Sequence, residues 1–142
     1  MRRPPVPLVP RTLRWGFVLV TLAVVVYFSL VTVPPRPPAT RTPFWDKYLH
    51  FLAYFGVGLA LAYATATYRD RPSVRAGLVL GGAIAFGAAI ELFQGALPHR
   101  YFGWGDLLAN CLGAGLVALW FPIERRIRYV RARRLAESIA PR

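Results

Sequence analysis

The sequence has few acidic residues, one lysine and one cysteine. Six Asp and Glu residues stand against 18 Lys and Arg residues, and the only lysine is Lys47. A single cysteine, Cys111, cannot form an internal disulfide, so it does not indicate a redox compartment. Serine occurs only at positions 29, 73 and 138. Neither residue type stands in a pattern typical of an activated nucleophile, and covalent Ser or Cys catalysis is therefore not indicated.

Motifs for metals, nucleotides and nucleic acids are also missing. The chain has no zinc-finger spacing, no His-x-x-x-His pair, no Gly-rich phosphate loop and no RNP-like aromatic motif. The net charge of +12 would suit nucleic acid or an anionic membrane surface. The arginines flank apolar runs, where they would meet anionic lipid. We therefore predict membrane lipids as partners, no nucleic acid, no metal and no cofactor.

Long apolar runs dominate what is present. Hydrophobic residues make up 56% of the chain, and the mean hydropathy is +0.40. Four runs are long enough for transmembrane helices, and proline-rich or polar segments separate them. We predict an all-α polytopic membrane protein with four transmembrane helices. The predicted segments are an N-terminal segment at 1–14, a first transmembrane helix at 15–33, a Pro-rich outer loop at 34–45, a three-helix core at 46–121 and a basic tail at 122–142.

The distribution of the arginines predicts which ends of these helices face the cytoplasm. With four spans, 14 arginines fall on the side of the two termini, and four basic residues fall on the other side. The positive-inside rule then predicts a multi-pass protein of the cell membrane with both termini in the cytoplasm. In the tail, Ile123, Ile127 and Val130 have helical spacing, which predicts a helix on anionic inner-leaflet lipid. The alternative is a solvated tail that only fixes the topology.

Small residues are frequent in the last three spans and rare in the first. Gly77 and Gly81 on the third span fit the small-xxx-small pattern that lets membrane helices approach closely. The first span is rich in Val and Leu and has only Gly16 near its start. We therefore expect the last three spans to form the tight core and the first span to pack outside it.

Polar side chains gather at the outer end of the predicted bundle. Glu91 lies among apolar neighbours, and an ionised carboxylate there needs a partner such as Lys47, His50 or Arg100. Spacings of three or four residues place the polar groups of each span on one helix face. These groups are Asp46, His50 and Tyr54 on the second span, Glu91 and Gln94 on the third, and Asp106, Asn110 and Gly113 on the fourth. We predict that the three faces converge on a polar pocket open to the outer surface.

These motifs resemble those of a known family. The patterns Asp46-Lys47-x-x-His50-Phe51 with Tyr54, Glu91-x-x-Gln94, Arg100 and Asp106-x-x-x-Asn110-x-x-Gly113 occur in this order. Over residues 44–121 the chain resembles the VanZ-like membrane proteins, which are named for an accessory protein of teicoplanin resistance. The resemblance implies a small polytopic membrane domain and a link to glycopeptide resistance. It implies no particular reaction.

The first functional hypothesis is a binding site for an anionic lipid or a lipid-linked cell-envelope head group. Lys47 and Arg100 would contact phosphate or carboxylate, and Arg100 offers a bidentate fork. Amides would add contacts, and carboxylates would orient the cations. The predicted ligand-binding residues are Asp46, Lys47, His50, Tyr54, Glu91, Gln94, Arg100, Asp106 and Asn110.

Three alternatives stay open. The first is an intramembrane enzyme acting on such a lipid, with His50 and Glu91 as catalytic acid and base and with Asp46 or Asp106 orienting His50. A metal-dependent variant would use these same four side chains as ligands. The second is a structural role, in which buried ionic groups fix helix register. The third is a transporter, for which four spans are few. The sequence does not indicate an oligomeric state.

Overall fold

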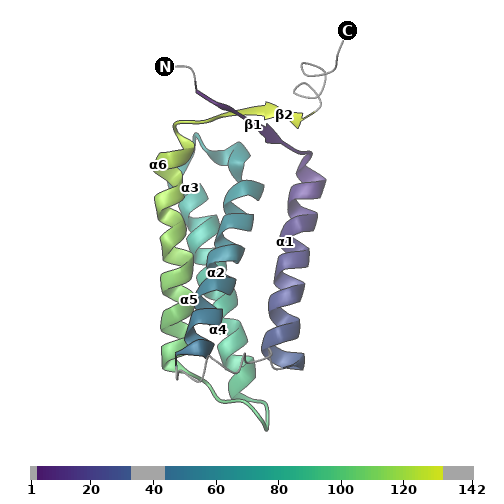
Figure 1. Ribbon diagram of the computed structural model, residues 1–142, viewed down its shortest axis with the longest axis vertical. Coiled ribbons are helices and arrows are strands. Elements are labelled where there is room, and N and C mark those ends of the chain that lie inside the picture. The colour runs from purple at the N-terminus through teal and green to yellow at the C-terminus, as the bar shows by residue number, and fades with distance from the viewer. Residues whose placement is uncertain (1–2, 33–43, 133–142) are drawn as a thin grey trace.

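The computed structural model describes residues 3–32 and 44–132, and within these ranges the chain is mostly helical (Figure 1). Short π-helical and 3-10 turns join α-helices end to end, so that the described chain contains four helical rods. The predicted four-helix architecture is confirmed. The rods are α1 (Arg11–Val26) with η1 (Tyr27–Val31); α2 (Trp45–Ala64) with η2 (Ala66–Tyr68); α3 (Pro72–Ala76), η3 (Gly77–Gly81) and α4 (Gly82–Gly95); and α5 (Trp104–Leu116), η4 (Val117–Leu119) and α6 (Trp120–Glu124).

Three of the rods are long and apolar enough to cross a membrane. They cover Arg11–Val31, Pro72–Gly95 and Trp104–Glu124. These rods support a multi-pass membrane protein. The remaining rod contains α2, whose first turns carry Asp46, Lys47 and His50. That α2 forms a further span stays a prediction.

Local sequence signals explain where the rods begin. Pro72 occupies the first turn of α3, where its missing N–H costs nothing. Asp106 lies in the first turn of α5, where a carboxylate interacts favourably with the helix dipole. The first rod begins at Arg11, one turn before the predicted start at residue 15. The buried Arg14 lies in this extra turn and donates to the carbonyl oxygens of Tyr63 and Ala64.

The tightest packing is between α2 and α5. A Cβ built on Gly113 would collide with the carbonyl oxygen of Phe51, and one built on Gly58 would lie 2.6 Å from Cγ2 of Val117. Glycine therefore lets the two backbones approach closely, as expected for small residues in membrane helices. The prediction was wrong for Gly77 and Gly81, because a Cβ on either meets no described atom within 4 Å.

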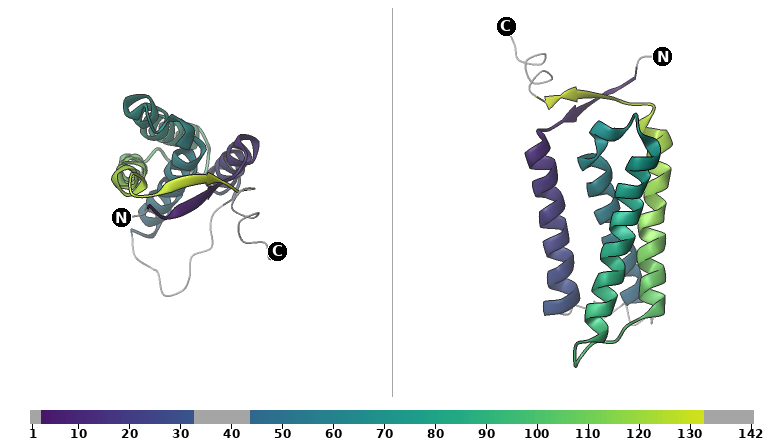
Figure 2. Two further views of the ribbon diagram at one scale, coloured as in Figure 1. Left: turned by 90° about the horizontal axis from the view of Figure 1, so that it is seen from above. Right: turned by 180° about the vertical axis from the view of Figure 1, so that it is seen from behind.

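The first rod lies at the edge of the bundle, beside α2 (Figures 1 and 2). Val18 of α1 packs against Ala60 and Ala64 of α2, and Val25 joins a cluster that contains Tyr54 and Ala83. The remaining rods pack more closely on one another (Figure 2). The first rod therefore lies at the edge of the bundle and packs directly on α2, and a separate three-helix core stays a prediction.

The segments before the first rod and after the last one form a small parallel sheet. Strand β1 (Pro5–Leu8) pairs with β2 (Arg128–Arg131), with Pro5 opposite Arg128 and Leu8 opposite Arg131. The helix predicted for the tail is wrong over Arg128–Arg131. The strand forms because both segments leave the bundle at the same end, where their backbones satisfy each other's hydrogen bonds. The rest of the predicted tail, 133–142, and most of the predicted Pro-rich loop lie outside the described residues.

The bundle therefore has two distinct ends. The strand end carries β1, β2 and the turn between α2 and α3, so the first and last described residues lie there (Figure 1). The loop end carries residues 96–103, which connect α4 to α5. An even number of spans requires both termini on one side, so this arrangement agrees with the predicted topology. The cytoplasmic location of the strand end stays a prediction.

Candidate functional site

Glu91 is the centre of a polar cluster at the loop end. Its side chain has no exposed surface, and it lies in the last turns of α4. The carboxylate accepts hydrogen bonds from the backbone N–H of Gly103 at 3.2 Å and from Nδ2 of Asn110 at 3.3 Å. Nδ1 of His50 lies 3.3 Å from its Oε1. Three helix faces therefore meet at this carboxylate, with α2 supplying His50, α4 supplying Glu91 and α5 supplying Asn110. The polar pocket on which they were predicted to converge is lined by neither Glu91 nor Asn110.

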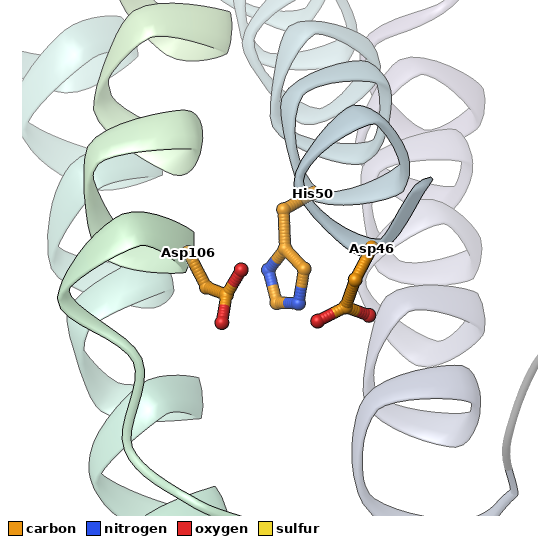
Figure 3. A group of neighbouring side chains, drawn as sticks. All are labelled: Asp46, His50 and Asp106. Carbon is orange, nitrogen blue, oxygen red and sulfur yellow. The ribbon is translucent and has the colours of Figure 1, made fainter. Parts of the chain in front are cut away.

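His50 is held by a defined set of acceptors. Its Nδ1 lies 3.0 Å from Oδ1 of Asn110 and 3.3 Å from Oε1 of Glu91. Because both neighbours accept hydrogen bonds, we infer that Nδ1 carries a hydrogen, which leaves Nε2 as the acceptor of the neutral ring. Figure 3 shows the imidazole lying between the carboxyl groups of Asp46 and Asp106. The ring is therefore oriented by its buried side and presents its other side toward Asp46.

Asp46, His50 and Asp106 lie close enough together to hold a metal ion. One donor atom each from Asp46, His50 and Asp106 lies within 4.8 Å of the other two (Figure 3). Nζ of Lys47, however, lies 2.7 Å from Oδ1 of Asp106 and forms an ion pair with it. The ammonium group already neutralises this carboxylate, so the charge balance does not call for a metal.

Lys47 and Arg100 do not face the pocket as freely as the sequence suggested. The Lys47 ammonium is engaged with Asp106. Nη2 of Arg100 donates to the carbonyl oxygens of Phe28 at 3.2 Å and Thr32 at 2.8 Å, at the end of the first rod. Helix ends carry unsatisfied carbonyl groups that attract cations. Arg100 therefore ties the loop end to the first rod and retains a charge that no described carboxylate neutralises within 4.0 Å.

Gln94 makes the second link to the first rod. Its Nε2 donates to the carbonyl oxygen of Ser29 at 3.0 Å. Sequence reasoning did not foresee these contacts, because the first span was expected to lie outside the polar cluster and its backbone carbonyls carry no signal in the sequence. The backbone N–H of Gly103, which binds Glu91, was missed for the same reason.

Two cavities meet at this cluster. The polar pocket, about 260 Å³ in volume, opens at the loop end and is lined by Trp45, Asp46, Leu49, His50, Gln94, His99, Arg100, Tyr101, Phe102, Gly103 and Asp106. The apolar cavity, about 500 Å³, lies between the first rod and α2 and is lined by Val24, Val25, Phe28, Ser29, Asp46, Leu49, His50, Leu52, Ala53, Tyr54, Gln94 and Arg100. Five lining residues belong to both, so the two cavities are neighbours that share part of their walls. These are Asp46, Leu49, His50, Gln94 and Arg100.

Tyr54 belongs to the apolar cavity rather than to the polar cluster. Its side chain is 1% exposed and lines the cavity wall. Its buried hydroxyl group has no hydrogen-bond partner among the described residues. An unpaired buried hydroxyl is costly and needs an explanation. The hydroxyl oxygen has almost no accessible surface, so a hydrocarbon chain in the cavity would not contact it directly.

A second polar cluster, at the strand end, was not foreseen. Arg75 of α3 is buried and donates to both carboxylate oxygens of Glu124 at the end of α6. The hydroxyl of Tyr129 donates to Oε1 of Glu124 at 2.5 Å. Burial and this hydrogen bond raise the pKa of Tyr129 above its ordinary value of 10.0. Glu124 is one of only six acidic residues, and that scarcity was the signal that could have drawn attention to it.

Comparison of the chain with protein-family models, with curated proteins and with solved structures gives no match. No family assignment follows from these comparisons. The functional argument therefore depends on the geometry of the described residues and on the motifs in the sequence.

Proposed function

We propose that this small membrane protein binds a lipid at its loop end, with the head group in the polar pocket and one hydrocarbon chain in the apolar cavity. The observation that carries the proposal is that a polar pocket and an apolar cavity lie next to each other and share five lining residues. A lipid is the class of ligand that is polar at one end and apolar at the other. Its chain would lie between the first rod and α2, at the depth of the bilayer.

The charges in the pocket indicate the kind of head group. Arg100 lines both cavities and keeps donors besides the group bound to Phe28 and Thr32, so it can contact a phosphate. Asp46 also lines both cavities and makes no hydrogen bond with another described side chain, so it can accept from hydroxyl or amino groups. We therefore expect a phosphate-bearing head group that also carries hydroxyl or amino groups.

The motif resemblance to VanZ-like proteins adds a biological context to the proposal. With both termini in the cytoplasm, the loop end would face outward, where cell-envelope lipids and lipid-linked wall precursors lie. A ligand of this kind would connect the protein to the cell envelope and, through the family resemblance, to glycopeptide resistance. Both connections are part of the proposal.

The binding proposal is tested with the full chain purified in a neutral detergent. Phosphatidylglycerol, whose head group has one phosphate and two hydroxyls, is titrated against the protein, and phosphatidylcholine serves as the comparison lipid. Asp46→Asn removes the acceptor charge, and Arg100→Lys keeps the charge but removes the fork. We expect each change to weaken phosphatidylglycerol binding by about tenfold. Exposed Arg11 at the strand end provides the control Arg11→Ala, which should leave this binding unchanged.

Equal binding of the two lipids by the wild-type protein would contradict the proposal. The same holds if Asp46→Asn and Arg100→Lys bind phosphatidylglycerol as tightly as Arg11→Ala does. Folding of each variant is checked by circular dichroism, because Arg100 also holds the end of the first rod.

An enzyme acting on such a lipid is a second candidate, and the orientation of His50 favours it. Asn110 and Glu91 hold Nδ1, and the opposite side of the ring faces Asp46 in the shared part of the cavities. This is the arrangement of a general base positioned by a buried carboxylate. Glu91 itself lines neither cavity, so it would position His50 and would not touch the substrate.

Turnover separates the enzyme from the binding protein. Lipid extract is incubated with the purified protein and analysed by mass spectrometry for a product that accumulates with time. In the enzyme hypothesis His50→Gln abolishes this product. A head group that binds without any new lipid species supports the binding function alone.

A further inference from the structure

A third cavity, about 430 Å³ in volume, lies at the strand end, away from the site already described. Three segments that are distant in the sequence supply its charged lining residues. Arg3 precedes β1, Arg69 and Asp70 lie in the turn before α3, Arg75 belongs to α3, and Arg125 follows α6. Folding therefore gathers four arginines around one cavity, which we call the basic pocket.

The net charge of the basic pocket depends on which of its charged side chains form ion pairs. Arg75 is 4% exposed, donates to Glu124 and to the carbonyl oxygen of Ala62, and lies 5.1 Å from the ring centre of Phe121. This ion pair is neutral overall, and both of its residues line the pocket. The side chains of Arg3, Arg69 and Arg125 make no hydrogen bond or ion pair with another described residue. Asp70 is the remaining acid of the lining. Three positive charges and one negative charge leave a net charge of +2.

The position of the pocket relative to the apolar rods indicates its depth in a membrane. One apolar rod begins at Pro72 and another ends at Glu124, and both residues line the pocket. If these rods cross the bilayer, the pocket lies at the level of the lipid head groups on that side. Pro72 and Phe121 add apolar surface next to the arginines, which suits the glycerol and upper chain region of a lipid.

We propose that the basic pocket binds the head group of an anionic lipid that carries two phosphodiester groups, as in cardiolipin. The two negative charges of such a head group match the net charge of the three unpaired arginines and Asp70. Guanidinium groups bind phosphate oxygens through paired N–H donors, and separate arginines on two sides of a cavity can hold two phosphates at once. The site belongs to the folded pocket and does not require the remainder of the basic tail. It is independent of the lipid site at the loop end.

The test compares two double variants of the full chain in nanodiscs. Arg69→Ala with Arg125→Ala removes two arginines from the pocket. Arg11→Ala with Arg128→Ala removes two exposed arginines near the strand end that do not line the pocket. Native mass spectrometry measures how much cardiolipin each protein retains from nanodiscs that contain a small fraction of this lipid. A parallel series uses phosphatidylglycerol at twice the mole fraction, so that the total lipid charge is equal.

We expect the pocket variant to lose cardiolipin binding by about tenfold or more, and the control variant by less than about threefold. The loss of cardiolipin in the pocket variant should exceed its loss of phosphatidylglycerol by about fivefold or more. Equal losses in the two double variants would show attraction by surface charge alone and would overturn the proposal. Equal losses of the two lipids in the pocket variant would overturn the assignment of a two-phosphate head group. Neither result would bear on the proposal that phosphatidylglycerol binds at the loop end.

Discussion

Glu91 organises the loop-end site through groups on three other segments. It receives hydrogen bonds from Gly103 and Asn110 and lies beside His50, while its own side chain is fully buried. A buried carboxylate is tolerated only when its oxygens are satisfied, and its removal leaves its partners unsatisfied. The residue therefore serves the site by positioning His50 and by closing the loop of residues 96–103 onto α4.

Replacement of Glu91 tests this positioning role. Glu91→Ala leaves the Gly103 N–H and the Asn110 amide without an acceptor, so we expect a loss of about 2–4 kcal/mol in the free energy of unfolding. Glu91→Gln keeps the shape and should cost about 1–2 kcal/mol. Both are measured by unfolding in mixed detergent micelles. An exposed neighbour provides the control Leu92→Ala, which should change stability little. Wild-type stability of Glu91→Ala would contradict the proposed role.

Tyr129 predicts a change of stability with pH at the strand end. Burial and the hydrogen bond to Glu124 raise its pKa in the folded protein above the value of 10.0 expected for an unfolded chain. The folded state thus holds this proton more tightly, and its contribution to stability is fully present below pH ~10. The contribution is lost as the pH rises further, because the unfolded chain releases the proton first.

We expect the melting temperature of the wild-type protein to fall between about pH 9.5 and 11, and that of Tyr129→Phe to fall less over the same range. Tyr101 is 87% exposed, so the control Tyr101→Phe should retain the wild-type dependence. Melting temperatures across this pH range, measured by intrinsic fluorescence, make the comparison. Identical dependence of melting temperature on pH in Tyr129→Phe and Tyr101→Phe would show that Tyr129 does not contribute to the pH dependence of stability.

At the scale of the elements, the contact between α2 and α5 fixes the geometry of the site. Gly113 lies against the backbone of Phe51, and Gly58 lies against Val117. This close approach places His50 and Lys47 of α2 next to Asn110 and Asp106 of α5. Any side chain at Gly113 must push the two helices apart, because the carbonyl oxygen it meets belongs to the backbone and cannot rotate away.

Gly113→Ala should therefore destabilise the protein by about 1–3 kcal/mol and weaken lipid binding at the loop end. Gly115→Ala is the matched control on the same helix, because a Cβ at this position meets no described atom within 4 Å. Alanine is the better helix former, so this control should be neutral or slightly stabilising. Thermal unfolding compares the two variants. Equal stabilities of the two variants would mean that the packing of α2 against α5 does not require glycine at position 113.

The sequence predicted the elements better than it predicted their contacts. Apolar runs and polar breaks sufficed for four helices, and the three- and four-residue spacings sufficed to bring His50, Glu91 and Asn110 together. Glycine pattern alone did not tell Gly113, which touches a backbone, from Gly77, which touches nothing nearby. Which glycine faces a neighbouring helix depends on helix rotation, and several rotations suit the same apolar run.

Contacts made by the backbone were beyond sequence reasoning. The carbonyl of Thr32 binds Arg100, and the N–H of Gly103 binds Glu91, but every residue offers such groups. The pairing of β1 with β2 was missed because Ile127 and Val130 fit a helical pattern equally well. Strand pairing there depends on a partner more than a hundred residues away in the sequence. Short apolar patterns do not distinguish these outcomes.

For the whole molecule, the main expectation is the orientation of the bundle. Residues 96–103 lie at one end, and the strands β1 and β2 lie at the other. In a Cys111→Ser background, Tyr101→Cys places a thiol at the loop end, and Ser73→Cys places one at the exposed start of α3 near the strand end. A membrane-impermeant maleimide applied to intact cells should label Tyr101→Cys and should label Ser73→Cys only after lysis. The reverse pattern would contradict the predicted topology.

The most direct test of the account is whether filling the apolar cavity expels a lipid. Ala53 lines this cavity, and Ala53→Trp would occupy the space assigned to the hydrocarbon chain. Ala85 is exposed on α4, so Ala85→Trp adds the same side chain outside the cavity. The test uses the full chain with Arg69→Ala and Arg125→Ala, which remove lipid binding at the basic pocket. In native mass spectra we predict that one phospholipid adduct persists in this background and with Ala85→Trp added, and that its abundance falls by about tenfold or more with Ala53→Trp added. An adduct that survives unchanged in Ala53→Trp, while that variant remains folded, would contradict the proposed lipid site.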